Sequence, residues 1–166
     1  QNPSSRYKPI GETERGTVAE LNEELLDRDF IISSLCVRPH YFAGWEGGAK
    51  ALLPGCSSLR TVTRNHSYVI GNPRARELVI DGNPVREDMN EVARMIETQG
   101  IKYRIVDFVP NQTDEPVFVR YGDPVTAHRE LARFGEGLCV VGTKPSSLVI
   151  TVADGYLGKN LFQSLK

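Results

Sequence analysis

The spacing of apolar residues predicts strands alternating with helices along most of the chain. Residues 29–37 are apolar at almost every position, which is typical of a strand covered on both faces. From Val85 onward, apolar residues recur at +4, +7, +8 and +11, which places them on one face of a helix. Asn83-Pro84 supplies a capping residue and a first-turn proline for this helix, and Gly100 ends it. We therefore expect an α/β fold, layered, with a mainly parallel sheet flanked by helices.

Weaker patterns suggest the remaining elements. Thr17 and Glu20 form a capping-box pattern, which predicts a short helix through Leu25 after a polar loop over residues 1–14. Further helices are expected from Ser57 or Ser58 through His66, from Asp123-Pro124 to a stop at Gly135, and from residue 160 onward. Further strands are expected at residues 102–109, 117–121, 138–141 and 148–152. A plausible linker at residues 144–147 divides the chain into residues 1–143 and 144–166.

Composition and charge exclude some classes of partner. The 166 residues have a net charge of −1, so no electrostatic attraction to nucleic acid or to an anionic membrane is expected. No stretch approaches the roughly 18 apolar residues of a membrane-spanning helix. Three separated cysteines without a secretion signal indicate reduced thiols and a cytoplasmic protein. We expect Cys36 and Cys139, which lie in apolar segments, to be buried and inert.

The most informative segment is a glycine-rich loop at residues 40–55, directly after a predicted strand. Gly44, Gly47 and Gly48 permit positive φ and a close approach of the backbone to a ligand. Lys50 follows them, and such a lysine could hold a phosphate or serve as a covalent attachment point. The segment is not a Walker P-loop, because Ala51 stands where that motif has serine or threonine. A tight turn without a ligand is the alternative.

Histidines lie on both sides of this loop in the sequence. His40 stands at the exit of the predicted strand, and His66 stands at the end of a predicted helix. Either imidazole alone is compatible with a structural role, although neutral imidazole is also the commonest metal ligand among side chains. Two histidines and Lys50 converging on one loop would form a site. His128 lies on an amphipathic helix and fits a surface or packing role.

Three segments together resemble the lactate racemase family, whose members are nickel-pincer-nucleotide 2-hydroxyacid racemases and epimerases. They are H-Y-F-A-G-W-E-G-G-A-K-A-L-L-P-G at residues 40–55, N-H at 65–66, and D-G-N-P-V-R-E-D-M at 81–89. The resemblance runs from about residue 10 to residue 166. It implies that residues 1–143 are the C-terminal portion of a cofactor-binding N-terminal domain and that residues 144–166 begin a second domain.

The resemblance also implies a cofactor and its ligands. The cofactor is a nickel complex of pyridinium-3-thioamide-5-thiocarboxylic acid mononucleotide. Lys50 matches the lysine that tethers it through a thioamide, and Gly47 and Gly48 lie in the matching loop. His66 matches the protein ligand that completes the nickel coordination, beside two sulfurs and a carbon of the cofactor.

The implied reaction is racemisation or epimerisation of a 2-hydroxy acid by reversible hydride transfer to the cofactor ring. His40 matches one of two histidines that exchange a proton with the substrate, and Gln163 and Lys166 match a Q-x-x-K pair near the substrate. The expected partners are a small 2-hydroxy acid and the enzymes that make the cofactor.

The chain departs from the family pattern in places. Trp45 and Glu46 replace the usual aromatic and small residue, which puts a carboxylate near the site. The second catalytic histidine has no counterpart, so we expect the chain alone to be inactive and to lack the cofactor. Two alternatives remain: a homologue that only binds a ligand, and a hydrolase that uses Cys56 with His40 or His66 as its base.

Overall fold

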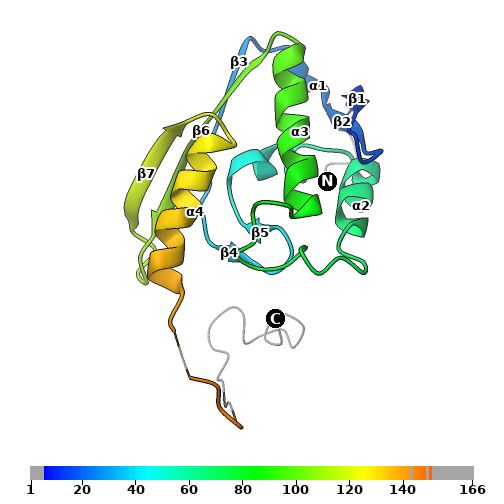
Figure 1. The fold of residues 1–166 in the computed structure, drawn as a ribbon. Coiled ribbons are helices and arrows are strands. Elements are labelled where there is room, and N and C mark those ends of the chain that lie inside the picture. The colour runs from blue at the N-terminus through cyan, green and yellow to red at the C-terminus, as the bar shows by residue number, and fades with distance from the viewer. Residues whose placement is uncertain (1–5, 143, 149, 151–166) are drawn as a thin grey trace.

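The computed structural model describes residues 6–142, 144–148 and 150, and Figure 1 shows the arrangement of their elements. The strands are β1 (Tyr7–Glu12), β2 (Val18–Asn22), β3 (Phe30–Ser33), β4 (Pro39–His40), β5 (Gly44–Trp45), β6 (Lys102–Pro110) and β7 (Pro116–Gly122). The helices are α1 (Glu23–Leu26), the 3-10 helix η1 (Gly48–Ala51), α2 (Leu59–Ser67), α3 (Pro84–Thr98) and α4 (Thr126–Cys139).

The main sheet has the strand order β3-β6-β7, and α3 and α4 pack against it (Figure 1). The layered α/β class is therefore confirmed. The sheet is mixed rather than mainly parallel, because β3 and β6 pair parallel whereas β6 and β7 pair antiparallel. A short turn joins β6 to β7, closed by a bond from the Asn111 N–H to the Glu115 carbonyl (2.9 Å). So short a connection can only reverse the chain.

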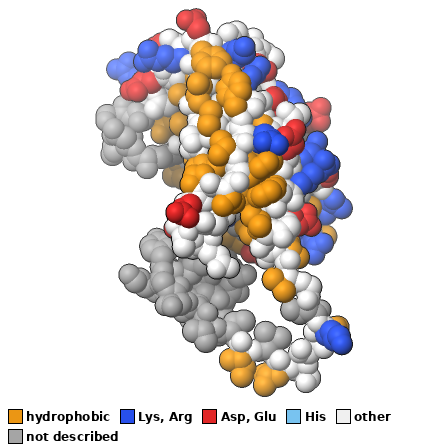
Figure 2. Space-filling view, turned by 90° about the vertical axis from the view of Figure 1, so that its left-hand side faces the viewer, with side chains coloured by type: hydrophobic (Ala, Val, Ile, Leu, Met, Phe, Trp, Pro, Cys, Tyr) orange, Lys and Arg blue, Asp and Glu red, His pale blue; other side chains and the backbone are white. Residues whose placement is uncertain are grey.

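One face of this sheet is covered and the other is open. The residues of β6 that face α3 and α4 are buried: Tyr103, Ile105, Asp107 and Val109. On the opposite face, Figure 2 shows apolar side chains gathered in a band over the sheet. The exposed large apolar residues of the two outer strands are Phe30, Ile32, Val117, Val119 and Tyr121.

The strongest sequence patterns are confirmed. Helix α3 begins at the Asn83 cap and buries the predicted apolar face, which comprises Val85, Met89, Val92, Ala93 and Ile96. Helix α2 begins at the Ser58 cap, and β6 and β7 lie where they were expected. Residues 29–37 contain β3, followed by a single bridge from Cys36 to Phe108, but the prediction that this strand is covered on both faces is wrong, because Phe30 and Ile32 are exposed. Helix α3 lies between the sheet and α2, so it supplies much of the main core.

The predicted loop and capping box near the N-terminus are wrong. Residues 7–22 form the antiparallel hairpin β1-β2, and between residues 6 and 29 only α1 is helical. The Thr17 hydroxyl donates to Asp88 (3.0 Å) instead of capping a helix. Ala19 and Leu21 are fully buried, and their alternation with less buried neighbours is the period of a strand. Tertiary burial has overridden a local capping signal here.

The prediction for the C-terminal part also needs correction. Helix α4 continues through Gly135 to Cys139, so residues 138 and 139 are helical and no strand forms at 140–142. Gly135 is required for packing, because a Cβ there would lie 2.8 Å from the Trp45 ring. Cys139 is exposed rather than buried, because it lies in the last turn of the helix. Cys36 is only partly buried.

Several expectations fall on residues beyond this description. Residues 148 and 150 are not in a strand, and the rest of the predicted strand at 148–152 and the helix from 160 lie outside the described residues. The division at 143/144 therefore stays a prediction. Across the part of the chain that the structure describes, no helix combines the length and apolarity needed to cross a membrane.

Candidate functional site

A buried arginine of α3 binds the glycine-rich loop through hydrogen bonds to its backbone. The Arg86 guanidinium donates from Nε to the Ala43 carbonyl (3.2 Å), from Nη1 to the Gly47 carbonyl (3.0 Å), and from Nη2 to the Trp45 carbonyl. Arg86 has no exposed surface. Its fork therefore satisfies alternate carbonyls along the strand that leads to η1 and Lys50.

The carbonyls of residues 44, 46 and 48 accept hydrogen bonds from other parts of the fold. Donors come from the Leu78 N–H to Gly44 (3.0 Å), from the His128 imidazole Nε2 to Glu46 (2.8 Å), and from the Tyr103 hydroxyl to Gly48 (3.1 Å). Six consecutive carbonyls, from residue 43 to residue 48, therefore have donors from outside the loop. Such a loop is rigid before any ligand arrives.

The glycines of this loop meet protein atoms closely. Gly47 and Gly48 have φ of 80° and 64°, which confirms the expected positive φ. A Cβ on Gly47 would lie 2.6 Å from Val37 and 2.8 Å from Asp107, and one on Gly48 would lie 2.9 Å from His128. Their small size is needed for packing inside the protein. A contact of Gly47 and Gly48 with the cofactor stays a prediction.

Asp107 anchors the loop from β6. Its Oδ2 accepts from the Gly48 N–H (2.6 Å) and its Oδ1 from the Leu35 N–H (2.8 Å). Burial raises the pKa of Asp107, and the two backbone bonds and the charge of Arg86 act against that rise. Asp107 and Arg86 were not found from the sequence. The available signals were an acidic residue at an inward-facing position of a strand and a basic residue in the first turn of a helix.

Lys50 lies on η1, directly after this rigid segment. Burial lowers the pKa of its amine to about 8, Glu46 opposes that change, and Arg86 adds to it. Within the described residues Lys50 makes no ion pair. At pH 7.5 a pKa of about 8 leaves roughly a quarter of such amines neutral, and the neutral amine is the nucleophile.

The two predicted histidines meet through a phenylalanine. The Phe42 ring makes edge contacts with His40 (centroids 4.6 Å apart) and with His66 (4.9 Å). Burial lowers the pKa of His66, and the charge of Lys50 lowers it further. The structure thus brings His40 and His66 together at Phe42, with Lys50 close enough to His66 for its charge to act on that ring. His66 is favoured in the neutral form, which is the form that binds a metal.

His40 is held in a defined tautomer. Its Nδ1 accepts from the Ala43 N–H (3.1 Å), so a neutral ring carries its hydrogen on Nε2. The ring also stacks on Tyr41, with centroids 4.6 Å apart. In this state Nε2 is a hydrogen-bond donor.

The other residues considered in the sequence analysis have different outcomes. Gln163 and Lys166 lie outside the described residues. His128 is almost fully buried and packs against Gly48, as its predicted packing role requires. Burial raises the pKa of the Cys56 thiol, which disfavours the thiolate that a hydrolytic nucleophile needs.

Comparison with known proteins shows which proteins this chain resembles. Residues 1–77 match the lactate racemase N-terminal domain. The chain is 32% identical over 165 residues to a lactate racemase of Thermoanaerobacterium thermosaccharolyticum, covering 98% of this chain and 38% of that protein. It is 30% identical over 159 residues to a lactate racemase of Lactiplantibacillus plantarum, covering 95% of this chain and 37% of that protein. The chain is thus similar to lactate racemases over almost all of its length.

Solved structures show the same similarity. The lactate racemase apoprotein from T. thermosaccharolyticum matches with a TM-score of 0.78 and 29% identity, over 87% of this chain and 34% of that chain. A protein from Thermotoga maritima matches with a TM-score of 0.70 over 82% of this chain and 37% of that chain, but at 21% identity it shows the fold alone. The chain spans less than two fifths of the length of the lactate racemases it matches.

Proposed function

We propose that this chain is the part of a 2-hydroxyacid racemase or epimerase that tethers the cofactor and supplies one histidine to the reaction. The observation that carries the proposal is that His40 and His66 both contact Phe42 and that the charge of Lys50 acts on His66, in a chain similar to lactate racemases. The substrate class is a small 2-hydroxy acid, lactate or a relative of it.

The residues present fit a lysine-tethered nickel pincer nucleotide. The Lys50 side chain is half-buried, has no ion pair among the described residues and has a lowered pKa, as a lysine that forms a thioamide should. His66 would bind nickel through its neutral imidazole. No three His, Cys, Asp or Glu side chains among the described residues are grouped to hold a metal by themselves, so nickel at His66 would take its other ligands from the cofactor. When bound, the cofactor supplies a ring that accepts and returns hydride.

His40 would exchange the proton of the substrate hydroxyl. With Nδ1 accepting from Ala43, the ring presents an N–H at Nε2, which suits a hydrogen bond to the carbonyl oxygen of the keto acid. To take up the hydroxyl proton at Nε2, the ring must carry its other hydrogen on Nδ1, and the bond from Ala43 must then open. The role therefore requires a small movement of His40. His128 is too buried to serve as a second base.

Other parts of the proposal concern the whole protein. We propose that Gln163 and Lys166 lie near the substrate and that the partners are the enzymes that make the cofactor. This chain alone should not racemise lactate, because it offers one histidine for a reaction that needs an acid or base on each face of the planar keto acid.

The test is mass spectrometry of the complete protein, made in cells that also make the cofactor-synthesis enzymes. A cofactor-sized adduct should appear on the peptide containing Lys50, and D-lactate should form from L-lactate in a chiral chromatography assay. Lys50→Ala should lose the adduct, whereas His66→Ala should keep it but retain less nickel. Lys102→Ala, at an exposed position of β6, is the matched control and should behave as wild type.

A clear negative result is available. The T. thermosaccharolyticum lactate racemase, made in the same cells, shows whether the cofactor is being supplied. If that protein is loaded while Lys50 stays unmodified, the proposal is wrong, and a homologue that only binds a ligand becomes the better description.

A further inference from the structure

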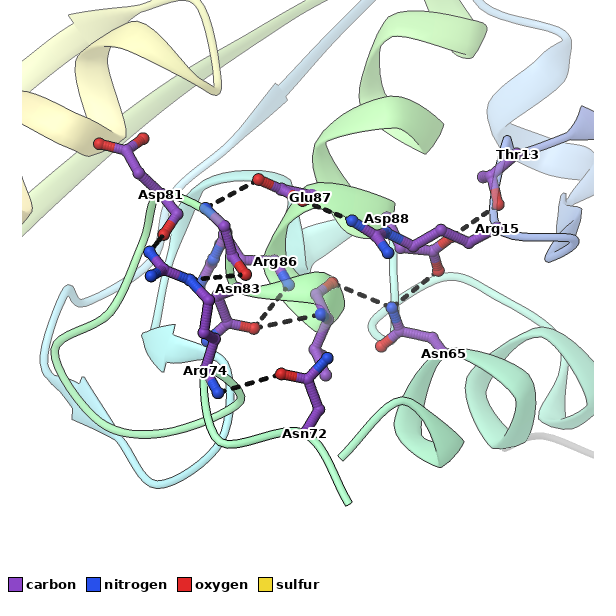
Figure 3. A network of polar contacts seen from close by, with 12 residues as sticks. Thr13, Arg15, Asn65, Asn72, Arg74, Asp81, Asn83, Arg86, Glu87 and Asp88 are labelled. Atoms are coloured by element: carbon purple, nitrogen blue, oxygen red, sulfur yellow. Dashed lines mark hydrogen bonds and ion pairs between the residues drawn. The ribbon is translucent and has the colours of Figure 1, made fainter. Parts of the chain in front are cut away.

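The first turns of α3 contact both halves of the candidate site. On one side Arg86 binds the loop that leads to Lys50, and the Asn83 amide donates to the Phe42 carbonyl (2.8 Å). On the other side the Asn65 amide of α2 donates to the Val85 carbonyl (3.0 Å). It also donates to Asp88 (2.8 Å), as Figure 3 shows. Asn65 directly precedes His66. A single helix end therefore fixes the lysine loop relative to the histidine helix.

We propose that Arg86 is the positioning residue of the lysine site: its guanidinium fixes the loop that carries Lys50 and keeps a permanent positive charge near the amine. The importance of Lys50 rests on the proposed function, but the effect of Arg86 on that amine does not.

Local structure gives no reason for an arginine at this position. Arg86 lies in the first turn of α3, where the helix dipole disfavours a cation. It is also fully buried, and it makes no ion pair with any carboxylate that the structure describes. A buried charge of this kind is costly unless its donors are satisfied. Here the donors are satisfied by three carbonyls of the loop, with Asp107 and Glu46 attracting the charge from a greater distance.

The fork shapes the loop as well as holding it. Its three nitrogens bind the carbonyls of residues 43, 45 and 47, so these alternate carbonyls all point toward one side chain. Gly47 is the last residue before η1, and Lys50 is the third residue of that helix. Loss of the fork would release the segment immediately before the lysine. Planar, five-donor arginine can bridge three carbonyls in this way, whereas lysine, glutamine and methionine cannot.

The charges around the amine have opposite effects. Glu46, on the same loop, raises the pKa of Lys50, and Arg86 lowers it. His66 of α2 and His128 of α4 also face the charge of Lys50. Burial lowers the pKa of each ring, and the charge of Lys50 lowers it further. Removing Arg86 should therefore make Lys50 hold its proton more tightly, and removing the charge of Glu46 should have the reverse effect.

The experiment measures acetylation of Lys50 in the complete, cofactor-free protein by an N-hydroxysuccinimide ester between pH 6.5 and pH 9.5, followed by peptide mass spectrometry. Wild type should show a midpoint near the pKa of about 8. Arg86→Gln should raise the midpoint by about half a pH unit or more, which slows labelling at pH 7.5 about threefold. Hydrogen exchange should also become faster in residues 43–50. Glu46→Gln should lower the midpoint.

Two comparisons keep the test decisive. Ile96→Ala removes a core side chain near the other end of α3 and lowers stability without removing a hydrogen bond to the loop. If Arg86 only stabilised the fold, Arg86→Gln and Ile96→Ala variants of equal stability would show the same dependence of Lys50 acetylation on pH. That result overturns the proposal. If Arg86→Gln does not fold, Glu46→Gln decides, because an unchanged midpoint there shows that neighbouring charges do not control the amine. Absence of the cofactor adduct on Lys50 would refute the proposed function but would leave these labelling results unaffected. The proposed function and the role of Arg86 are therefore tested independently.

Discussion

Replacing Gly47 by alanine tests the packing of the lysine loop. At φ of +80° an alanine costs about 1–2 kcal/mol in backbone strain, offset by roughly 0.4–1 kcal/mol because the unfolded chain becomes less flexible. The new Cβ would also lie 2.6 Å from Val37 and 2.8 Å from Asp107, and overpacking of this kind costs about 1–3 kcal/mol. The free energy of unfolding should therefore fall by about 2–4 kcal/mol.

Gly100→Ala is the matched control for this change. Gly100 has nearly the same φ, +83°, but a Cβ there meets nothing within 4 Å. Its substitution should cost only about 1 kcal/mol, since it retains the strain and lacks the clash. Both variants can be compared with wild type by urea denaturation, with the same slope assumed for all three. Equal losses in the two variants would show that Gly47 is not packed against Val37 and Asp107.

Three further predictions follow from single side chains. Burial lowers the pKa of His128, so the folded protein keeps this ring neutral while the unfolded chain binds a proton below its ordinary pKa of about 6.5. The free energy of unfolding should therefore be full above that pH and fall by up to about 1.4 kcal/mol per pH unit below it. Urea denaturation from pH 8 to pH 5 should show that the free energy of unfolding falls less steeply with pH in His128→Gln than in wild type. Asn83→Ala removes the α3 cap and the bond to Phe42, and should lower the thermal midpoint in line with a loss of about 2 kcal/mol, whereas Asn83→Ser, which keeps a cap, should lose less. Iodoacetamide at pH 8 should label exposed Cys139 well before Cys56, whose burial raises its thiol pKa, and the reverse order in peptide mass spectra would contradict the described burial.

The site was predictable where a residue type itself carries the chemistry. Lys50, His40 and His66 became candidates because an amine and two imidazoles stood near a dense group of glycines, and the resemblance to the lactate racemase family gave them their predicted roles. Arg86 and Asp107 were missed because their role depends on burial and on a contact with the loop. In the sequence, Arg86 is an ordinary residue of a helical first turn, and Asp107 is one acidic residue in an apolar strand. Only the fold brings both of them to the loop.

The sequence by itself determined the elements whose signals are local and repeated. Helix α3 has an apolar stripe, a cap and a stop, and β6 has an alternating apolar face, so packing reinforced what the chain already favoured. Tertiary structure alone decided the β1-β2 hairpin, the path of α4 through Gly135 and the mixed pairing of the sheet. Each of these depends on a partner far away in the sequence: Asp88 for Thr17, Trp45 for Gly135, and β3 and β7 on the two sides of β6. A local sequence pattern reflects the preference of one segment alone. The free energy of burial and hydrogen bonding depends on both of the segments that come into contact.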